Sequence, residues 1–170
     1  MTTIRAATVR DADAIAALHM RTWQAAYREL MPAEFLAQLD VPARAERWRR
    51  NLAGDGETFV IEDTTGQIAG FCSLLAASDE DVDRATTGAI AALYIDQPHW
   101  RSGLGKALMR VATERARARG FRQLLLWVLE GNQSARRFYE QHGFVTDGYS
   151  KTEDYGGTLL RGLRYVTERV

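Results

Sequence analysis

The chain has 170 residues, 46% of them hydrophobic, which is enough for one buried core and too short for two comfortable domains. We therefore expect residues 1–170 to form a single domain. The 22 basic and 22 acidic residues cancel, so no overall charge favours nucleic acid or an anionic membrane as a partner.

The first half of the chain predicts one strand, three helices and a hairpin. Strands are expected where apolar and polar residues alternate, and helices where apolar residues recur at helical spacing. The expected elements are a strand at 3–9, a helix that Asp11 caps, helices near 32–39 and from Pro42 to Leu52, and strands at 58–63 and 67–76. The segment Thr64-Thr65-Gly66 would join the last two strands as a hairpin.

The second half predicts strands that alternate with helices. After an acidic loop at 79–87, the expected elements are a strand at 88–96, a helix from Gly103 to Gly120, a strand at 124–129, a helix at 132–142, and strands at 144–149 and 159–167. Because residues 124–129 are almost all apolar, this strand should be covered on both faces and have a parallel neighbour. The order predicts an α/β fold of mixed α+β type, with a central mixed, mostly antiparallel sheet of about six to seven strands flanked by helices.

Two features predict a cytoplasmic protein. Cys72, the single cysteine, allows no internal disulfide and lies in an apolar stretch typical of a core thiol, which suggests a reducing compartment. The sequence also has no apolar run of about 18 residues and no apolar leader at the N-terminus.

Residues 91–108 contain the most informative pattern, an apolar strand followed by a proline, a Gly-x-Gly turn and a helix. The first amides of a helix have no intrahelical partner and carry partial positive charge, so they attract anions. Gly103 and Gly105 lack a Cβ and would let a diphosphate approach these amides, while Arg101 and Lys106 add charge at the rim. The pattern predicts a phosphate pocket, and an ordinary strand-to-helix turn remains the alternative.

A second motif lies about 30 residues further on, within the same strand–helix–strand–helix unit. It reads Asn132-Gln133-Ser134-Ala135-Arg136-Arg137-Phe138-Tyr139-Glu140-Gln141-His142-Gly143-Phe144. The two motifs and the element order together resemble the GNAT-type N-acetyltransferases. The resemblance is strongest from Gly88 to Phe144 and covers the rest of the chain by element order. It implies that the chain moves an acetyl group from acetyl-CoA, its cosubstrate, to an amine.

For acetyl-CoA, the resemblance implies a site made largely of backbone. The strand Leu93-Tyr94-Ile95 would pair with the amides of the pantetheine arm, as a neighbouring strand does. The pyrophosphate would lie on the amides of Arg101, Ser102, Gly103, Leu104, Gly105 and Lys106. The family pattern has Gln or Arg three places before the first glycine, where this chain has Trp100. This departure removes one expected side-chain contact and leaves the amides intact.

Two further contacts to the cosubstrate are expected from the second motif. Asn132 would bond the pantetheine arm, although an asparagine there also suits a helix N-cap. Either Arg136 or Arg137 would reach a CoA phosphate, and Arg137 is the residue that we assign. The alternative for both arginines is the solvated side of an amphipathic helix.

Tyr139 is the catalytic residue that the resemblance implies, as the general acid that protonates the departing CoA thiolate. A phenol with a pKa of about 10 stays protonated at neutral pH and can donate to a thiolate whose thiol has a pKa of about 8.5. The amine would attack directly in a ternary complex, with the oxyanion held by a backbone amide of residues 93–95. Without the resemblance, Tyr139 is typical of a core aromatic beside Phe138.

The sequence identifies neither a general base nor a metal site. Ala91 and Ala92 occupy the strand position where a carboxylate could act, and Asp96, His99 and Glu130 are typical of solvated loops. The histidines lack metal-ligand spacing, so no metal is expected.

The acceptor pocket is predicted to include Trp23, Tyr27 and Trp127, which suit a small amine with an apolar part or a cation over a ring. Packing in the core is the alternative for all three. An acidic run could attract a cationic amine or lie solvated in a loop; it comprises Asp79, Glu80, Asp81 and Asp83.

Three kinds of function remain open from the sequence. The acceptor is expected to be a small molecule; the alternatives are a protein N-terminus or lysine, and a catalytically silent CoA-binding module that regulates a partner. A homodimer is one further expectation, through an exposed edge of the strand at Leu159 to Thr167.

Overall fold

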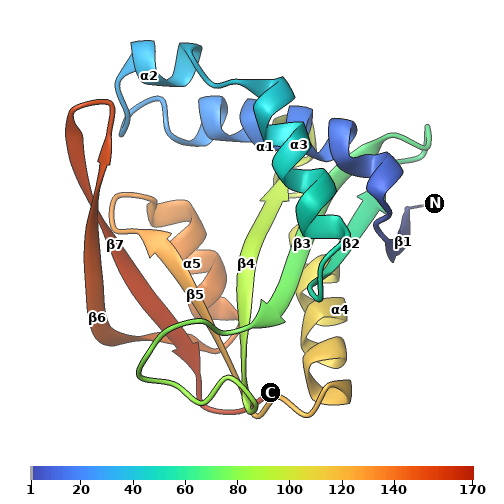
Figure 1. Cartoon of the computed structure of the whole chain (residues 1–170), viewed down its shortest axis with the longest axis vertical. Coiled ribbons are helices and arrows are strands. Elements are labelled where there is room, and N and C mark those ends of the chain that lie inside the picture. The colour runs from blue at the N-terminus through green and yellow to red at the C-terminus, as the bar shows by residue number, and fades with distance from the viewer. Residues whose placement is uncertain (1) are drawn as a thin grey trace.

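The computed structural model describes residues 2–170, which are built around one twisted sheet (Figure 1). Its seven strands lie in the order β1-β2-β3-β4-β5-β7-β6 in this part of the chain. The strands are β1 (Thr3–Ala6), β2 (Glu57–Glu62), β3 (Ile68–Ala76), β4 (Thr87–Ile95), β5 (Gln123–Leu129), β6 (Phe144–Tyr155) and β7 (Thr158–Thr167). The helices are α1 (Ala12–Ala26), α2 (Ala33–Ala37), α3 (Val41–Leu52), α4 (Leu104–Ala118) and α5 (Gln133–Gln141).

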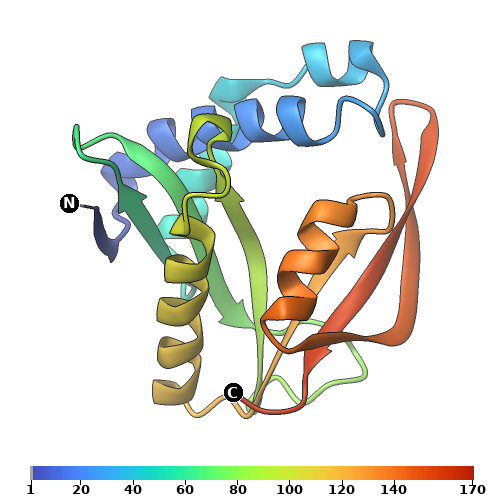
Figure 2. The ribbon, with the colours of Figure 1, turned by 180° about the vertical axis from the view of Figure 1, so that it is seen from behind.

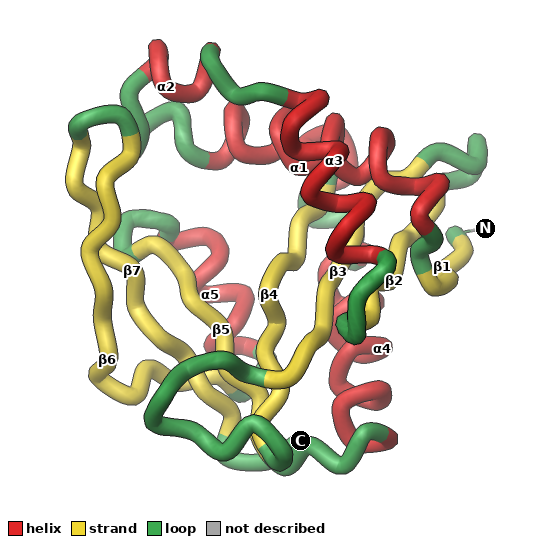
Figure 3. Tube along the Cα trace, in the orientation of Figure 1, coloured by secondary structure: helices red, strands yellow, loops and turns green. Residues whose placement is uncertain are grey.

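The middle of the sheet is where β4 and β5 meet. All neighbouring strands pair antiparallel except these two, which run parallel. Their pairing covers only three residue pairs, from Thr87 with Gln123 to Ala89 with Leu125. Gly88 permits this close junction, because a Cβ there would come within 2.7 Å of the Phe121 ring. Beyond Ala89 the two strands diverge and leave an opening in the sheet, as Figure 3 shows.

Helices cover both faces of the sheet. On one face α1 and α3 lie over β2, β3 and β4, and on the other α4 and α5 pack against the sheet (Figure 2). The apolar side of α4 is buried at four-residue steps, at Leu104, Leu108, Ala112 and Ala116. This periodicity fixes which side of α4 faces the core and leaves its arginines toward solvent.

The predicted fold class is confirmed, including the mixed, mostly antiparallel sheet and the parallel neighbour of β5. Two strand lengths were wrong. β1 ends at Ala6, because the Thr8 amide donates to Asp11 Oδ2 at 2.7 Å and the chain turns into a short 3₁₀ segment. β6 continues to Tyr155 instead of ending at Tyr149, because the hairpin turns at Gly156 and Gly157, both with positive φ.

The predicted dimer edge at Leu159 to Thr167 is also wrong. β7 lies between β5 and β6 and pairs with β5 from Gly162 to Val166 and with β6 along its length, so most of this predicted edge is already occupied. The free edges of the sheet are those of β1 and β6. Cys72 is fully buried, as predicted. No helix within residues 2–170 combines the length and the apolar character needed to cross a membrane.

Candidate active site

A cavity of about 1130 Å³ lies between β4, β5 and the helices around them. It brings together every residue predicted for the site, from segments far apart in the sequence. These are Trp23, Tyr27, Leu93, Tyr94, Ile95, Arg101, Ser102, Gly103, Leu104, Gly105, Lys106, Trp127, Asn132, Arg137 and Tyr139. The cavity therefore joins the two sequence motifs to the aromatic residues of α1 and β5.

One end of the cavity is the beginning of α4. The first intrahelical bond runs from the Ala107 amide to the Gly103 carbonyl at 3.1 Å, so the amides before Ala107 point out of the helix. Gly103 has φ +85°, and open space lies where its Cβ would stand. Arg101 also has positive φ, at +61°, which turns the chain into the helix. The exposed side chains of Arg101, Lys106 and Arg137 surround these amides with positive charge.

The free edge of β4 forms one wall. Because β4 leaves β5 after Ala89, the backbone groups of Leu93, Tyr94 and Ile95 that face β5 have no strand partner there. On its other side the strand pairs regularly with β3, except at Ala91, which lies in a bulge between the pairs Ser73–Ala92 and Leu74–Ile90. The bulge redirects the strand where the opening begins.

Asn132 and Tyr139 lie on α5 at the opposite wall. The Asn132 side-chain oxygen accepts from the Ala135 amide at 3.2 Å, so Asn132 caps the helix as well as lining the cavity. Tyr139 is only 9% exposed and its ring packs edge-on against Phe138 and Phe144, with centroids 5.4 Å and 5.9 Å away. Burial raises the pKa of Tyr139 far above its usual value, so its phenol stays protonated and can only donate a proton.

Aromatic residues line the other end of the cavity. The Trp23 indole donates to the Tyr94 hydroxyl at 3.1 Å, and its ring contacts Tyr27 edge-on with centroids 5.3 Å apart. Tyr27 is buried with Met31 and Leu36, so these residues both pack in a core cluster and line the cavity. The two expectations for Trp23 and Tyr27 are therefore compatible.

Residues of β6 close this aromatic end, and the sequence did not point to them. Lys151, Glu153 and Tyr155 line the cavity, and Tyr155 lies 6.3 Å from the Trp23 ring. They were missed because β6 was expected to end at Tyr149; the glycine pair at 156 and 157 was the signal that would have placed the turn. The Tyr94 side chain was also missed, since only its backbone was assigned a role.

Hydrogen bonds set the charge at this end. The Tyr155 hydroxyl donates to Glu153 Oε2 at 2.9 Å, and Lys151 lies 3.2 Å from Glu153 Oε1. These contacts hold the pKa of Glu153 below its usual value, while burial raises the pKa of Tyr155 to about 12. Burial also raises the pKa of Tyr27 and of Tyr94. At neutral pH the aromatic end thus has protonated hydroxyls and one paired carboxylate.

Comparisons with known proteins agree with this architecture. A model of the Acetyltransferase (GNAT) family matches residues 13–144. This chain belongs to the GNAT family. The uncharacterized N-acetyltransferase YuaI of Bacillus subtilis (strain 168) is 31% identical over 137 residues, which cover 79% of this chain and 75% of that protein.

Two solved structures share the GNAT fold over almost the whole chain. The N-acetyltransferase of Staphylococcus aureus Mu50 has a TM-score of 0.75 at 18% identity and covers 98% of this chain and 97% of its own. The PaiA N-acetyltransferase of Thermoplasma acidophilum, solved in complex with coenzyme A, has a TM-score of 0.73 at 18% identity and covers 98% of each chain. As a GNAT member, the chain is an acetyl-CoA-dependent N-acetyltransferase.

Trp100 marks a departure from the GNAT motif, and the structure shows what it does instead. Its indole donates to the Ile95 carbonyl at 2.6 Å and so closes the turn between β4 and α4 from one side. Trp100 as a whole is 42% exposed and lines the cavity. The side-chain bond stabilises the turn that leads to the GNAT glycines.

The residues considered as bases lie in three different places. Asp96 pairs with Arg21 at 2.7 Å and Glu130 with Arg161 at 3.2 Å, and neither lines the cavity. His99 lines the end near α4, with Nε2 3.6 Å from Asp63. Glu153 is the one carboxylate among the described residues that line the GNAT cavity, and both its oxygens have partners. The geometry therefore identifies no unpaired carboxylate as a base.

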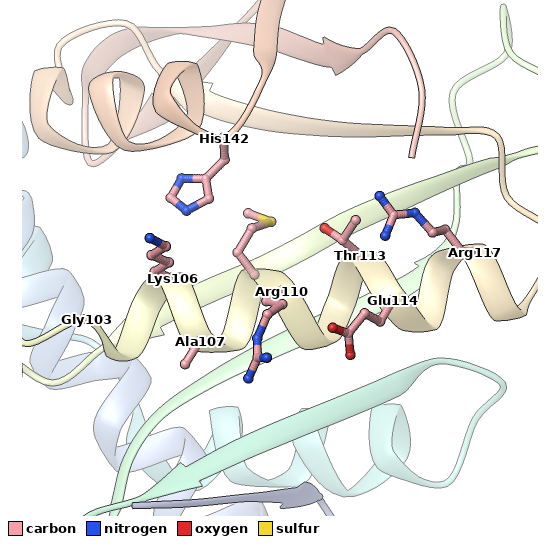
Figure 4. Close-up of a pocket in the computed structure, with 9 residues that line it drawn as sticks. Gly103, Lys106, Ala107, Arg110, Thr113, Glu114, Arg117 and His142 are labelled. Carbon is pink, nitrogen blue, oxygen red and sulfur yellow. The ribbon is translucent and has the colours of Figure 1, made fainter.

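A smaller cavity of about 490 Å³ continues along α4 (Figure 4). It shares Gly103, Lys106 and His142 with the larger one. Arg110 and Arg117 lie along the same side of the helix as Lys106, and Glu114 is the carboxylate among them. His142 Nδ1 lies 2.7 Å from the Phe138 carbonyl, so Nδ1 donates to that oxygen. The groove favours anions because its cations outnumber its carboxylate.

The predicted acidic run has another role in this GNAT structure. Asp79 and Asp81 bind the buried Arg164 instead of facing an amine, and neither lines the cavity. Within residues 2–170 there is no group of three or more His, Cys, Asp or Glu residues placed to hold a metal ion.

Proposed function

We propose that this enzyme transfers the acetyl group of acetyl-CoA to a primary amine of a small molecule, by direct attack in a ternary complex. The observation that carries the proposal is that one cavity has two chemically different ends. The end at α4 offers backbone amides and cations, and the end at α1 and β6 offers aromatic rings. A thioester held at the first end would meet an amine held at the second.

The cofactor end suits acetyl-CoA. The unpaired edge of β4 at Leu93, Tyr94 and Ile95 provides donors and acceptors in strand geometry, which the amides of pantetheine can match. The amides of residues 101–106 provide an anion site for the pyrophosphate. Arg137 extends from α5 toward the same rim, whereas Arg136 is bound to Tyr165 and to the Glu130 carbonyl. Asn132 lines the same cavity, which supports its proposed contact to the pantetheine arm.

Tyr139 is the general acid in this proposal. The amine nitrogen attacks the thioester carbonyl carbon, and a β4 amide stabilises the oxyanion that forms. When the carbon–sulfur bond breaks, the thiolate takes the Tyr139 proton and leaves as CoA thiol. The proton that the nitrogen releases restores the phenol through solvent. Burial keeps Tyr139 protonated before each turnover and also makes it a weaker acid, so the proton passes only as negative charge develops on the sulfur.

The aromatic end supports a small acceptor. Trp23 and Tyr27 at the end of α1 contact each other, Tyr155 of β6 lies beside Trp23, and Trp127 of β5 lines the same cavity. An amine with an apolar or aromatic body would bury that body against these rings. A polypeptide would need a longer open groove.

The test combines calorimetry with acetyl-CoA and thiol release against a panel of aromatic amines, polyamines, amino acids and short peptides. We expect acetyl-CoA to bind, one class of small amines to release thiol, and Tyr139→Phe to lower kcat by about 100-fold without weakening acetyl-CoA. Tyr165→Phe is the matched control, because Tyr165 is equally buried beside α5 but lies outside the cavity. Its kcat should stay unchanged.

Three results would contradict the proposal in different ways. No binding of acetyl-CoA would remove the cofactor site. Binding without turnover of any amine would favour the silent CoA-binding module. Turnover of peptides alone would favour a protein acetyltransferase.

A further inference from the structure

A buried cation ties the loop between β3 and β4 to the far end of the sheet. Arg164, on β7, is only 3% exposed. Its guanidinium donates to both oxygens of Asp81 at 2.6 Å and to Asp147 at 2.8 Å, and lies 3.9 Å from the Tyr149 ring. In Figure 1 the loop after β3 reaches below β5 and β7, where this arginine binds it. Buried charges of this kind stay paired, so the loop has a defined position.

Asp79 joins this cluster to the cavity. Its Oδ1 accepts from Arg164 Nη1 at 3.3 Å and also from the Trp127 indole nitrogen at 3.1 Å. Asp79 is the residue of the loop that contacts both the arginine and a cavity side chain. A carboxylate that is itself held in place orients the indole more firmly than a mobile one would.

The Trp127 ring is held on its other sides too. The Lys151 ammonium lies 4.8 Å from the ring, and β7 backs it at Gly162, where a Cβ would stand 3.8 Å from Trp127 Cε3. Both Trp127 and Lys151 line the cavity, and Lys151 pairs with Glu153, which accepts from Tyr155 at the aromatic end. The position of this wall therefore depends on a loop that does not itself line the cavity.

We infer that Asp79, held by Arg164, is a positioning residue that orients Trp127 as a wall of the acceptor end and so sets acceptor affinity. The inference rests on the proposed function, because it takes the aromatic end as the acceptor site. It predicts that Asp79 acts on the acceptor and leaves the affinity for acetyl-CoA unchanged, since the loop contacts the chain after the C-terminal end of α4 and does not line the cavity at the first turn of that helix. Removal of the carboxylate frees the indole to adopt other rotamers and weakens the wall without removing it.

The test uses three variants chosen to separate orientation from stability. Asp79→Ala removes both contacts of the carboxylate, and Asp79→Asn keeps an oxygen that can accept from the indole. Asp81→Ala is the matched control, because it takes the two shortest bonds from Arg164 and does not touch Trp127. The first measurement is the indole N–H signal of Trp127 in proton–nitrogen NMR spectra, identified by its loss in Trp127→Phe.

We expect the Trp127 indole signal to shift in Asp79→Ala and to stay near its original position in Asp79→Asn and Asp81→Ala. With the amine of the panel that gives the highest rate, KM for the amine should rise at least fivefold in Asp79→Ala. The same KM should change less than twofold in the other two variants, with kcat at saturation and acetyl-CoA affinity unchanged in all three.

Two results would overturn the inference. An unshifted indole signal in Asp79→Ala would show that the carboxylate does not orient Trp127. An equal rise of KM in Asp81→Ala would show that the cluster acts only through the stability of the loop. If wild-type protein acetylates no amine of the panel, the proposed function fails, and the indole signal alone then decides whether Asp79 positions Trp127.

Discussion

The two ends of the cavity are built in different ways. The cofactor end comes mostly from one continuous stretch, residues 93–106, and works through backbone amides and an unpaired strand edge. The acceptor end comes from side chains of α1, β5 and β6. Trp23 and Tyr155, which both belong to it, are more than a hundred residues apart in the sequence. Backbone groups are the same in every residue, whereas side chains are not.

This difference has a consequence for how each end tolerates change. The cofactor end depends on the path of the chain, so it is sensitive to glycines and insensitive to most side chains nearby. The acceptor end depends on which rings stand there and on what orients them. Substitutions at one end should therefore leave the ligand of the other end almost unaffected.

The largest effect is expected at Gly103. Its φ of +85° costs a β-branched residue about 1–2 kcal/mol, and a side chain there would fill the space before the α4 amides. Gly103→Val should weaken the binding of acetyl-CoA about 100-fold, or by about 2.7 kcal/mol, in a calorimetric titration. Gly120→Val is the control, since Gly120 has φ +82° and open space at the other end of α4. It should lose similar stability and keep its affinity; an equal loss of affinity would show that helix stability explains both.

Acid should destabilise the side of the molecule that carries the acceptor end. His19, on α1, is buried among Trp23, Trp48 and Tyr94 beside Arg44, and burial lowers its pKa from 6.5 to about 3. In the unfolded chain His19 binds a proton that it does not bind in the folded chain, so the free energy of unfolding decreases as pH drops below about 6.5.

Between pH 6 and 4.5, the free energy of unfolding from urea titrations should decrease by about 1.4 kcal/mol per pH unit. His19→Gln should remove most of this slope. Asp11 does not interfere, because its lowered pKa of about 2 matters only in stronger acid. A slope that persists in His19→Gln would assign the acid sensitivity to other groups.

Trp23→Leu should raise the KM for the acceptor about tenfold, which corresponds to about 1.4 kcal/mol. The affinity for acetyl-CoA should not change. The variant loses a ring of the cavity and the bond to Tyr94. Trp48→Leu is the control, because Trp48 packs on the same histidine but does not line the cavity. Steady-state kinetics with each substrate varied in turn would show the split, and a change in acetyl-CoA affinity would break the separation of the two ends.

The smallest effect is expected at the rim of the cofactor end. Arg137 is exposed, so its ion pair with a phosphate contributes less than about 1 kcal/mol and is screened by salt. Arg137→Gln should weaken the binding of acetyl-CoA about threefold at low salt and less at high salt, as measured by calorimetric titration at two ionic strengths. Arg136→Gln should leave affinity unchanged, because Arg136 is bound to Tyr165 and to the Glu130 carbonyl.

The success of sequence reasoning followed the same division between the two ends. The glycine turn at Gly103 and Gly105 could be predicted, because a few neighbouring residues decide where a strand ends, where the chain turns and where a helix begins. The extent of β6 could not, because residues 150–155 are mostly polar and exposed, and they form a strand by pairing with β7. The sequence therefore did not predict that Lys151, Glu153 and Tyr155 line the cavity.

The acidic run shows the same limit in another form. Asp79 and Arg164 are separated by 85 residues, and nothing near either residue predicts their contact. Each could be described from sequence only as a charge on a loop or a strand. Their pairing depends on β7 lying between β5 and β6, which places Arg164 beside the loop.

The sequence by itself determined the family, the order of the elements and the glycine turn that begins α4, because these depend on local backbone geometry and on periodic burial. Only the tertiary structure decided which rings line the cavity together, which carboxylate accepts from the Trp127 indole and which partners Glu153 has there. Those features arise where side chains from distant segments meet, and their contacts depend on strand order and packing rather than on neighbours in the chain.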